Sequence, residues 1–484
     1  MGIIFKQSFK NTLVTYIGFG IGAVNTLFLY TRFLTEEYFG LVGVILSTSA
    51  ILTPIMAFGV PNTLVKYFSR FKDSKSKQNF LSLMLLSPLL LIIPIALLSY
   101  LSYDIISAFL SRKNEIVKDY VWYIFLIGMA MAYFEVFYAW AKVHMKSVFG
   151  NFMKEVFVRI CISIALLLVY LDLLTVEGFL KLMVGIYLLR TVVMKLYAYS
   201  LSLPRISLIP PENASSIMAY SSFIVLGGSV AVVLLEIDRF MINQFIQIEN
   251  VAYYTVSIFI ATVIAVPSRA MHQITYPMTA EIMNNGSWDK LKDLYQKSSL
   301  TLFIIAGLIF LLIILNLGDL YTMLPPNYRD GLFVVFFIGL AKVFDALLGN
   351  NNAILFNSEY YKALLIMGMF LAILTIFLNL WLIPIYGIDG AAIASFSAIA
   401  VYNIVKLYYV KLKFNAQPFT AETLKVLLLL ILVGVPLCFL QFTFHPLLNI
   451  GLKSILICLV YIGVLYRFRI SEDVYGILSR WIKW

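Results

Sequence analysis

Charged residues and cysteines are scarce in this chain. Only 13% of its 484 residues are Asp, Glu, Lys or Arg, whereas 61% are hydrophobic. A soluble core of this size could not hide so much apolar surface, so the composition excludes a water-soluble protein and indicates a lipid solvent. The three cysteines, Cys161, Cys438 and Cys458, lie in apolar runs without metal-ligand spacing. We expect no disulfide, no metal site and no cofactor.

Motifs of familiar enzymes are missing as well. The chain contains no GxxxxGK(S/T) loop, no HExxH and no GxSxG, which argues against ATP hydrolysis and against the common hydrolase chemistries. We expect two of its three histidines, His144 and His445, to lie at membrane interfaces. No catalytic residue is predicted, and a transporter is favoured over an enzyme. A membrane glycosyltransferase or polymerase is an alternative, but it would need a longer acidic loop than this chain has.

The positive charge of the chain does not indicate a nucleic-acid partner. The formal net charge is +11, but the basic residues are scattered among short loops and form no patch interleaved with aromatic residues. Membrane topology explains them, since cytoplasmic loops are enriched in Lys and Arg. Most of them fall on the side that holds the N-terminus, above all between residues 66 and 77. We therefore expect a multi-pass protein of the cytoplasmic membrane with both termini in the cytoplasm.

Long apolar runs dominate the sequence. About twenty apolar residues cross roughly 30 Å of hydrocarbon as a helix. The predicted fold class is an all-α integral membrane protein with about fourteen transmembrane helices. The expected spans cover residues 11–33, 41–60, 81–102, 121–141, 157–174, 179–199, 219–243, 251–271, 300–318, 332–353, 363–383, 389–410, 425–444 and 451–468.

An internal repeat organises these spans. The segment 125–130 returns as 336–341, and Glu177-Gly178 returns as Asp389-Gly390, each 211 or 212 positions later. Two copies of one unit are typical of transporters, and six spans per copy make the repeats parallel. The predicted parts are a six-span lobe at 1–203, a cytoplasmic linker at 204–218, a second six-span lobe at 219–414, and two further spans with a cytoplasmic tail at 415–484.

Basic residues inside the spans are the first candidate site. Each ionisable group in a membrane helix costs about 2.5–3.5 kcal/mol unless it faces a cavity or a partner. Guanidinium groups bind phosphate oxygens in a bidentate fork, so a shared cationic cavity would suit a phosphorylated substrate. Some of these side chains have a simpler alternative role, namely reaching to the membrane surface. The predicted substrate-binding residues are Arg32, Arg159, Arg190, Arg239, Arg269 and Lys342.

Acidic residues inside the spans are the second candidate site. Glu135 and Asp345 occupy nearly equivalent positions of the two copies, which favours a shared lumen. Together with Asp238 they are candidates for ion coupling. Lys342 precedes Asp345 by one helical turn, so a local ion pair that neutralises both is an alternative for these two residues.

One passage near the end of the second copy carries a family resemblance. The stretch 378–394, with Pro384, Gly387 and Gly390 in LNLWLIPIYGIDGAAIA, resembles the junction between spans 11 and 12 of polysaccharide flippases. Asp238-Arg239 and Phe39-Gly40 are similar to the openings of that family's two halves. The chain thus resembles the O-antigen and exopolysaccharide flippases of the multidrug/oligosaccharidyl-lipid/polysaccharide (MOP) exporter superfamily.

This resemblance implies a function. It implies alternating access between two lobes, which moves an undecaprenyl-diphosphate-linked oligosaccharide from the inner to the outer leaflet for surface polysaccharide synthesis. Membrane lipids, a polysaccharide polymerase and chain-length machinery are the implied partners. Arg32 and Arg269 are the closest positional analogues of the cationic cavity in related lipid II flippases. The alternative is a cation-coupled multidrug or small-molecule exporter of the same superfamily, in which Glu135 would hold the cation.

Overall fold

The computed structural model describes residues 2–71, 73–204, 206–207, 209–472, 474–476 and 479. These residues form helices and short connections without any strand. Nine of their helices are long and apolar enough to cross a membrane. The predicted all-α membrane class is confirmed. Contacts divide the chain into an N-terminal unit, residues 1–255, and a C-terminal unit, residues 256–484.

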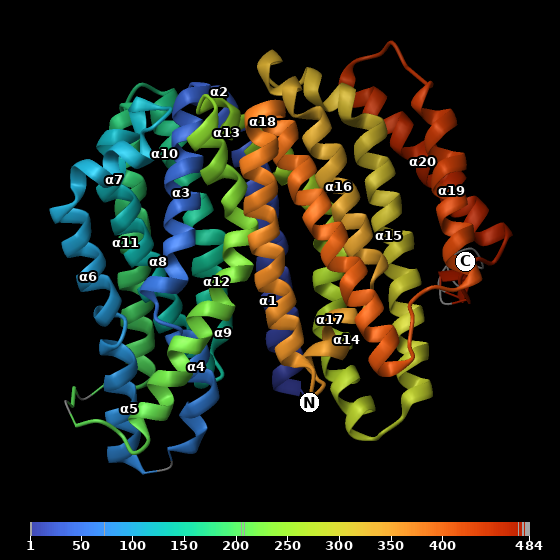
Figure 1. Cartoon of the computed structure of the whole chain (residues 1–484). Coiled ribbons are helices and arrows are strands. Elements are labelled where there is room, and N and C mark those ends of the chain that lie inside the picture. The colour runs from blue at the N-terminus through green and yellow to red at the C-terminus, as the bar shows by residue number, and fades with distance from the viewer. Residues whose placement is uncertain are drawn as a thin grey trace. The chain divides into compact units, whose positions relative to one another are not determined.

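The N-terminal unit is built from the first twelve helices and the short helical turns between them (Figure 1). Their bounds are α1 Gly2–Val24, η1 Asn25–Leu29, α2 Tyr30–Phe33, α3 Glu36–Met56, α4 Val60–Tyr67, η2 Phe68–Arg70, α5 Ser74–Leu86, α6 Leu89–Leu101, α7 Tyr103–Leu110, η3 Glu115–Tyr120, α8 Val121–Val143, α9 Ser147–Phe152, η4 Met153–Phe157, α10 Val158–Tyr170, α11 Val176–Leu201 and α12 Ala214–Phe245.

The C-terminal unit begins within α13 and contains all later helices. Their bounds are α13 Glu249–Thr262, η5 Val263–Ala265, α14 Val266–Asn284, α15 Trp288–Thr322, η6 Pro326–Gly331, α16 Leu332–Leu347, α17 Asn351–Phe356, α18 Tyr361–Phe414, α19 Ala421–Cys438 and α20 Pro446–Arg467.

Most expected spans fall on these helices, but the runs 41–60, 81–102 and 332–353 each cross a turn between two helices, and two others are too long at one end. The run 157–174 continues past the end of α10 at Tyr170, and the run 425–444 continues past the end of α19 at Cys438. Both extensions are wrong because hydropathy marks where a segment prefers lipid but not where its backbone stops being helical. The apolar residues beyond these helix ends lie in turns and extended connections.

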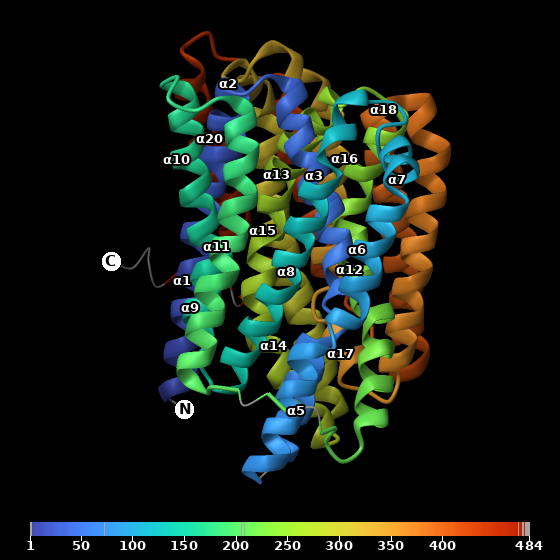
Figure 2. The ribbon, with the colours of Figure 1, turned by 90° about the vertical axis from the view of Figure 1, so that its left-hand side faces the viewer.

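Helix α8 forms the centre of the N-terminal unit. It packs against α3 and α11, and α3 packs in turn against α12. Figure 2 shows α8 running between α11 and α3. Its buried side chains include Phe134 and Trp140, which belong to a core with residues from α4, α5 and α11. Trp140 and Phe134 are almost fully buried, so α8 is surrounded by protein over much of its length.

Helix α15 has the corresponding place in the C-terminal unit, where it contacts α14, α16, α19 and α20. The last helix is attached to it by polar bonds as well as apolar packing. Tyr461 donates from its hydroxyl to the carbonyl of Ile304 at 3.0 Å. Lys453 donates to the carbonyl of Leu315 at 3.0 Å. The two helices that follow the repeat are therefore an integral part of this unit.

A glycine turn divides α18 into two legs. Gly387 has φ 60° and ψ −135°, a conformation that L residues with a side chain avoid, and it lies three residues after Pro384. Figure 1 shows the two orange legs meeting near the α18 label. The turn at this junction was expected from the sequence. The two legs approach each other so closely at this turn that position 390 requires a glycine, because a Cβ there would clash with the carbonyl oxygen of Leu382.

Gly390→Ala is therefore expected to destabilise the protein by at least about 2 kcal/mol, because the added methyl group meets backbone that cannot move aside. Thermal unfolding of the purified protein in detergent measures the effect. Gly318→Ala in α15 is the matched control, since a Cβ there has no neighbour within 4 Å. Equal melting temperatures for the two variants would contradict the tight turn.

Candidate functional site

Arg190 is the most deeply buried of the predicted basic residues. It lies on α11, and only 6% of its surface is exposed. Its guanidinium carbon lies 4.1 Å from the ring centroid of Phe134 and 4.8 Å from that of Tyr187. Its Nε has no hydrogen-bond partner in the described part of the chain. Aromatic faces attract a cation but do not neutralise it, so Arg190 keeps a positive charge inside the helical bundle.

Glu135 and Arg159 are both held by neighbours of opposite charge. Lys154 of η4 lies 2.6 Å from Glu135 Oε1, and Glu155 of η4 lies 3.2 Å from Arg159. Glu135 and Glu155 also act electrostatically on Arg190. We call these five residues the N-terminal charge cluster. Two acids face three bases within it, so the cluster carries a net positive charge, and it brings together three of the predicted residues.

Two π-helical turns hold this cluster in place. η1 interrupts the first span and η4 the fifth, and such turns are frequent at functional sites. Asn25 of η1 donates to the carbonyl of Arg159 at 2.9 Å, and Ser163 donates to the Asn25 amide oxygen at 2.6 Å. Sequence reasoning missed Asn25 and Ser163, although a polar amide within the apolar run 11–33 was an available signal.

Asn25→Leu is expected to lower stability by about 1–2 kcal/mol, because Ser163 and the Arg159 carbonyl lose a buried partner. Ser163→Ala removes only one of the two bonds and should cost about half as much. Thermal unfolding in detergent measures both variants. An unchanged melting temperature for Asn25→Leu would show that these bonds do not couple spans 1 and 5.

Asp238 and Arg239 on α12 also belong to the N-terminal unit, but each has its own partner. Asp238 is buried and accepts a hydrogen bond from the Tyr254 hydroxyl at 2.5 Å. Arg239 forms an ion pair with Glu236 at 2.5 Å, a partner that sequence reasoning missed. Arg32 is exposed in the last turn of α2.

A second group of charges joins three helices of the C-terminal unit. Asp345 of α16 has a half-exposed side chain and lies 3.9 Å from the ammonium group of Lys406 on α18. Lys406 is only 1% exposed, and it donates to the Asn352 amide oxygen at 2.9 Å. His272 of α14 interacts electrostatically with both Asp345 and Lys406. We call Asp345, Lys406 and His272 the C-terminal charge cluster.

Sequence reasoning found only Asp345 in this cluster. Lys406 was not among the predicted site residues, although it stands inside the expected span 389–410. Lys342, the local partner considered for Asp345, is half-buried one turn before it, and Arg269 is exposed one turn before His272. The packing of α16 against α18 supplies Asp345 with a tertiary cation that no local spacing indicated.

The two clusters consist of basic and acidic side chains, which can bind charged groups. No group of three His, Cys, Asp or Glu residues that could hold a metal ion occurs in the described ranges. In the C-terminal cluster a buried base, Lys406, lies next to an acid, whereas in the N-terminal cluster the ion-paired bases are partly exposed and the buried Arg190 has no carboxylate within 4.0 Å among the described residues. Six of the nine predicted site residues lie in the N-terminal unit and three in the C-terminal unit.

Comparisons with known proteins agree with this architecture. The profile described as polysaccharide biosynthesis protein matches residues 4–283, more than half of the chain. No curated protein matches. The structure of a lipid II flippase, MurJ, in an inward closed conformation is similar to this chain, with a TM-score of 0.74 and 14% identity over 95% of this chain and 99% of that one.

Structures of multidrug transporters are also similar. An inward-facing MATE family transporter of the MOP superfamily gives a TM-score of 0.63 and 16% identity, covering 84% of this chain and 94% of that one. An outward-facing structure gives 0.57 and 16%, covering 85% and 96%. These identities are low, so the structural likeness shows the fold. With the profile match over more than half of its length, this chain of apolar helices belongs to the polysaccharide biosynthesis protein family.

Proposed function

We propose that this protein is a flippase that moves an undecaprenyl-diphosphate-linked oligosaccharide from the inner to the outer leaflet of the cytoplasmic membrane. Arg190 is the observation that carries the proposal. Its guanidinium is buried, and no carboxylate lies within 4.0 Å of it among the described residues. A buried cation without an ion-pair partner requires a counter-charge, and a diphosphate provides one.

The other predicted basic residues differ in exposure and in ion pairing, and we propose different contributions for them. Arg32 and Arg269 have exposed side chains, and each would offer a guanidinium to a diphosphate. Arg159 and Arg239 each have one carboxylate neighbour and retain further N–H donors for a phosphate. Lys342 is half-buried and would add a point charge. The arrangement fits an anionic headgroup better than a neutral one.

The moving parts of the proposed cycle are the two repeats. The lobes at 1–203 and 219–414, joined by the linker 204–218, would alternate between openings to the two sides of the membrane. The segment 415–484 would support the second lobe through α19 and α20. We place both termini in the cytoplasm, so the substrate enters from the side where it is made. The released product would pass to a polysaccharide polymerase and its chain-length machinery.

A cation-coupled multidrug or small-molecule exporter is the second candidate. The half-exposed carboxylate of Asp345 favours it, because an acid beside a buried lysine can exchange that partner for a proton or a metal cation. Glu135 and Asp238 would serve the same purpose in the N-terminal unit. The two candidates are compatible if ion binding drives the translocation of the lipid-linked sugar.

Deletion of the gene tests the proposal directly. We expect surface polysaccharide to be lost and the lipid-linked repeat unit to accumulate on the inner leaflet, with both effects reversed by the wild-type gene. Accessibility of the sugar to a membrane-impermeant lectin, in vesicles of known orientation, measures the leaflet. Unchanged polysaccharide would overturn the flippase assignment, and drug sensitivity without polysaccharide loss would favour the exporter.

A further inference from the structure

A pocket of about 760 Å³ lies at one end of the C-terminal unit, and its lining shares no residue with either charge cluster. Three chain segments form it, namely the turn between α14 and α15, the connection between α17 and α18, and the end of α18. Small-molecule sites have volumes of roughly 300–1,000 Å³. Each of these segments follows an even number of expected spans, so the pocket opens on the side that we propose is cytoplasmic.

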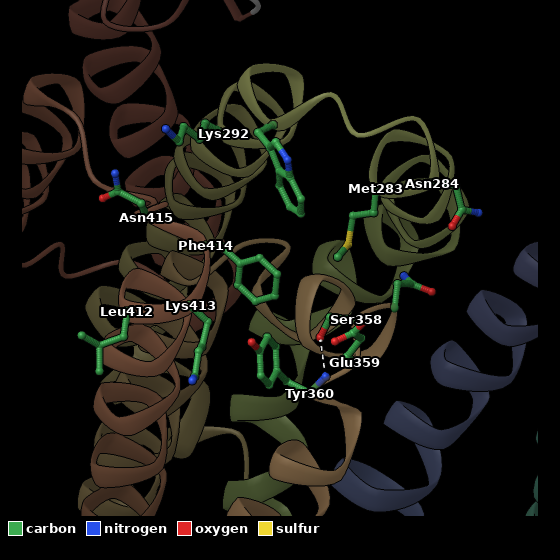
Figure 3. Close-up of a pocket in the computed structure, with 12 residues that line it drawn as sticks. Met283, Asn284, Lys292, Ser358, Glu359, Tyr360, Leu412, Lys413, Phe414 and Asn415 are labelled. Carbon is green, nitrogen blue, oxygen red and sulfur yellow. Dashed lines mark hydrogen bonds between the residues drawn. The ribbon is translucent and has the colours of Figure 1, made fainter.

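Aromatic rings line part of this pocket. Trp288 is 49% exposed, and its ring centroid lies 6.1 Å from that of Phe414. Tyr360 meets Phe414 edge to face at 5.8 Å. Figure 3 shows Phe414, Tyr360 and Lys413 gathered on the α18 side of the pocket. Rings that already pack against one another lose little freedom when a flat ligand covers the exposed one, Trp288.

Lysines provide a positive charge beside the rings. Lys292 and Lys413 line the pocket, and an adjoining cavity of about 340 Å³ shares Lys292 and adds Lys411. None of these three lysines has a carboxylate within 4.0 Å in the parts of the chain that the structure describes. Lys297, only five residues after Lys292, is paired with Asp293 at 2.8 Å. The ammonium groups of the pocket thus lack the carboxylate partner that Lys297 has.

Hydrogen-bonding groups complete the lining. Asn284 and Asn415 are exposed, and each amide offers two donors and an acceptor oxygen. Asn415 has a left-handed backbone with φ 46°, which ends α18 at the pocket wall. Glu359 is the acidic residue among those that line the pocket, and its carboxylate can accept hydrogen bonds from the hydroxyl groups of a sugar-like ligand. Ring faces, amides and a carboxylate suit a polyhydroxylated ring, whereas the lysines suit a phosphate.

We propose that this pocket binds a phosphate ester of a polyhydroxylated ring, as in a glycosyl phosphate, on the cytoplasmic side of the C-terminal unit. Lysine ammonium groups bind phosphate as point charges, and Trp288 covers the ring. The site shares no residue with the intramembrane charges, so it is additional to the proposed translocation path. Such a group can come from the surrounding solution or from the headgroup of an anionic membrane lipid, since basic pockets at helix ends bind both.

Binding of three soluble probes to the full chain in phosphatidylcholine nanodiscs tests the site. Calorimetric titration with glucose 1-phosphate is expected to show saturable binding that is tighter than the binding of inorganic phosphate, while glucose alone binds most weakly. Lys292→Gln/Lys413→Gln should weaken both phosphate probes about tenfold. Trp288→Ala should weaken glucose 1-phosphate about fivefold and leave inorganic phosphate unchanged.

Lys290→Gln is the matched control, because Lys290 is exposed on the same helix but does not line the pocket. It should bind all probes as the wild type does. Absence of saturable glucose 1-phosphate binding, or equal binding by the lysine double variant and the wild type, would overturn the proposal. Equal affinity of Trp288→Ala and wild type for glucose 1-phosphate would also overturn it, because a ring site would then be absent.

Nanodiscs that contain phosphatidylglycerol identify the source of the ligand. If phosphatidylglycerol displaces glucose 1-phosphate from the wild type, the pocket accepts the headgroup of an anionic lipid. If the affinity for glucose 1-phosphate is the same with and without phosphatidylglycerol, the pocket takes its phosphate ester from solution. Both results keep the phosphate site, and they assign its natural ligand to the membrane or to the cytoplasm. Measured on purified protein, the assay does not depend on translocation.

Discussion

Arg190→Leu is expected to abolish surface polysaccharide in a deletion strain that expresses the variant, and Arg190→Lys to lower it at least about tenfold. The leucine removes the one buried guanidinium that has no carboxylate partner in the described structure. Lysine retains the charge but not the planar fork, so it cannot make two parallel bonds to a phosphate. Quantitative extraction of surface polysaccharide at matched protein levels measures the effect.

The stability of the same variants separates a binding role from a structural one. Leucine in place of a buried charge among Phe134 and Tyr187 should leave the melting temperature unchanged or raise it, because an apolar residue there has no desolvation cost. Lys195→Gln on the same helix is the control, since Lys195 is exposed, and should retain wild-type polysaccharide. Normal polysaccharide with Arg190→Leu would end the proposal that this residue binds the diphosphate.

Asp345→Asn is expected to lower stability by about 2 kcal/mol, because Lys406 is then buried without a carboxylate. We expect a smaller loss of stability than for a fully buried ion pair, because the side chain of Asp345 is half-exposed. Lys406→Met should be nearly neutral, since water can hydrate the aspartate that remains. The double variant Asp345→Asn/Lys406→Met should be more stable than Asp345→Asn alone, and thermal unfolding of all four proteins measures this coupling.

Lys342→Met is the control for the local alternative. If Lys342 were the main partner of Asp345, adding Lys342→Met to Asp345→Asn would restore stability and adding Lys406→Met would not. Polysaccharide synthesis gives a second readout. If Asp345 binds the coupling cation, the stable double variant stays inactive, whereas wild-type activity in it would remove Asp345 from the coupling mechanism.

Much of the fold could be predicted because it depends on local properties. Each apolar run prefers lipid by itself, and inside lipid its backbone must satisfy its own hydrogen bonds as a helix. The junction between the legs of α18 was predictable for the same reason, since Pro384 disfavours a continuous helix and Gly387 permits the positive φ of the turn, and both effects are local. The ends of α10 and α19 were less predictable, because apolar residues continue beyond the last helical turn.

The partners of the candidate site residues were the least predictable part. Glu135 was recognised as an acid inside a span, but Lys154, its partner, stands 19 positions later on a π-helical turn. For Asp345 the sequence offered Lys342 of its own helix as an alternative partner, and the structure adds Lys406 from α18. Hydropathy assigns an unfavourable insertion free energy to a charged residue in a span, but it does not indicate which neighbouring residue neutralises that charge.

The sequence by itself determined that this chain lies in a membrane, where most of its helices lie and which superfamily it resembles, because each of these depends on residues close together in the chain. The tertiary structure alone decided which charges are neutralised and which remain. Ion pairs such as Lys406 with Asp345 form where helices distant in sequence pack together. The low dielectric of this packing strengthens the electrostatic interactions of each charge that remains unpaired, such as that of Arg190.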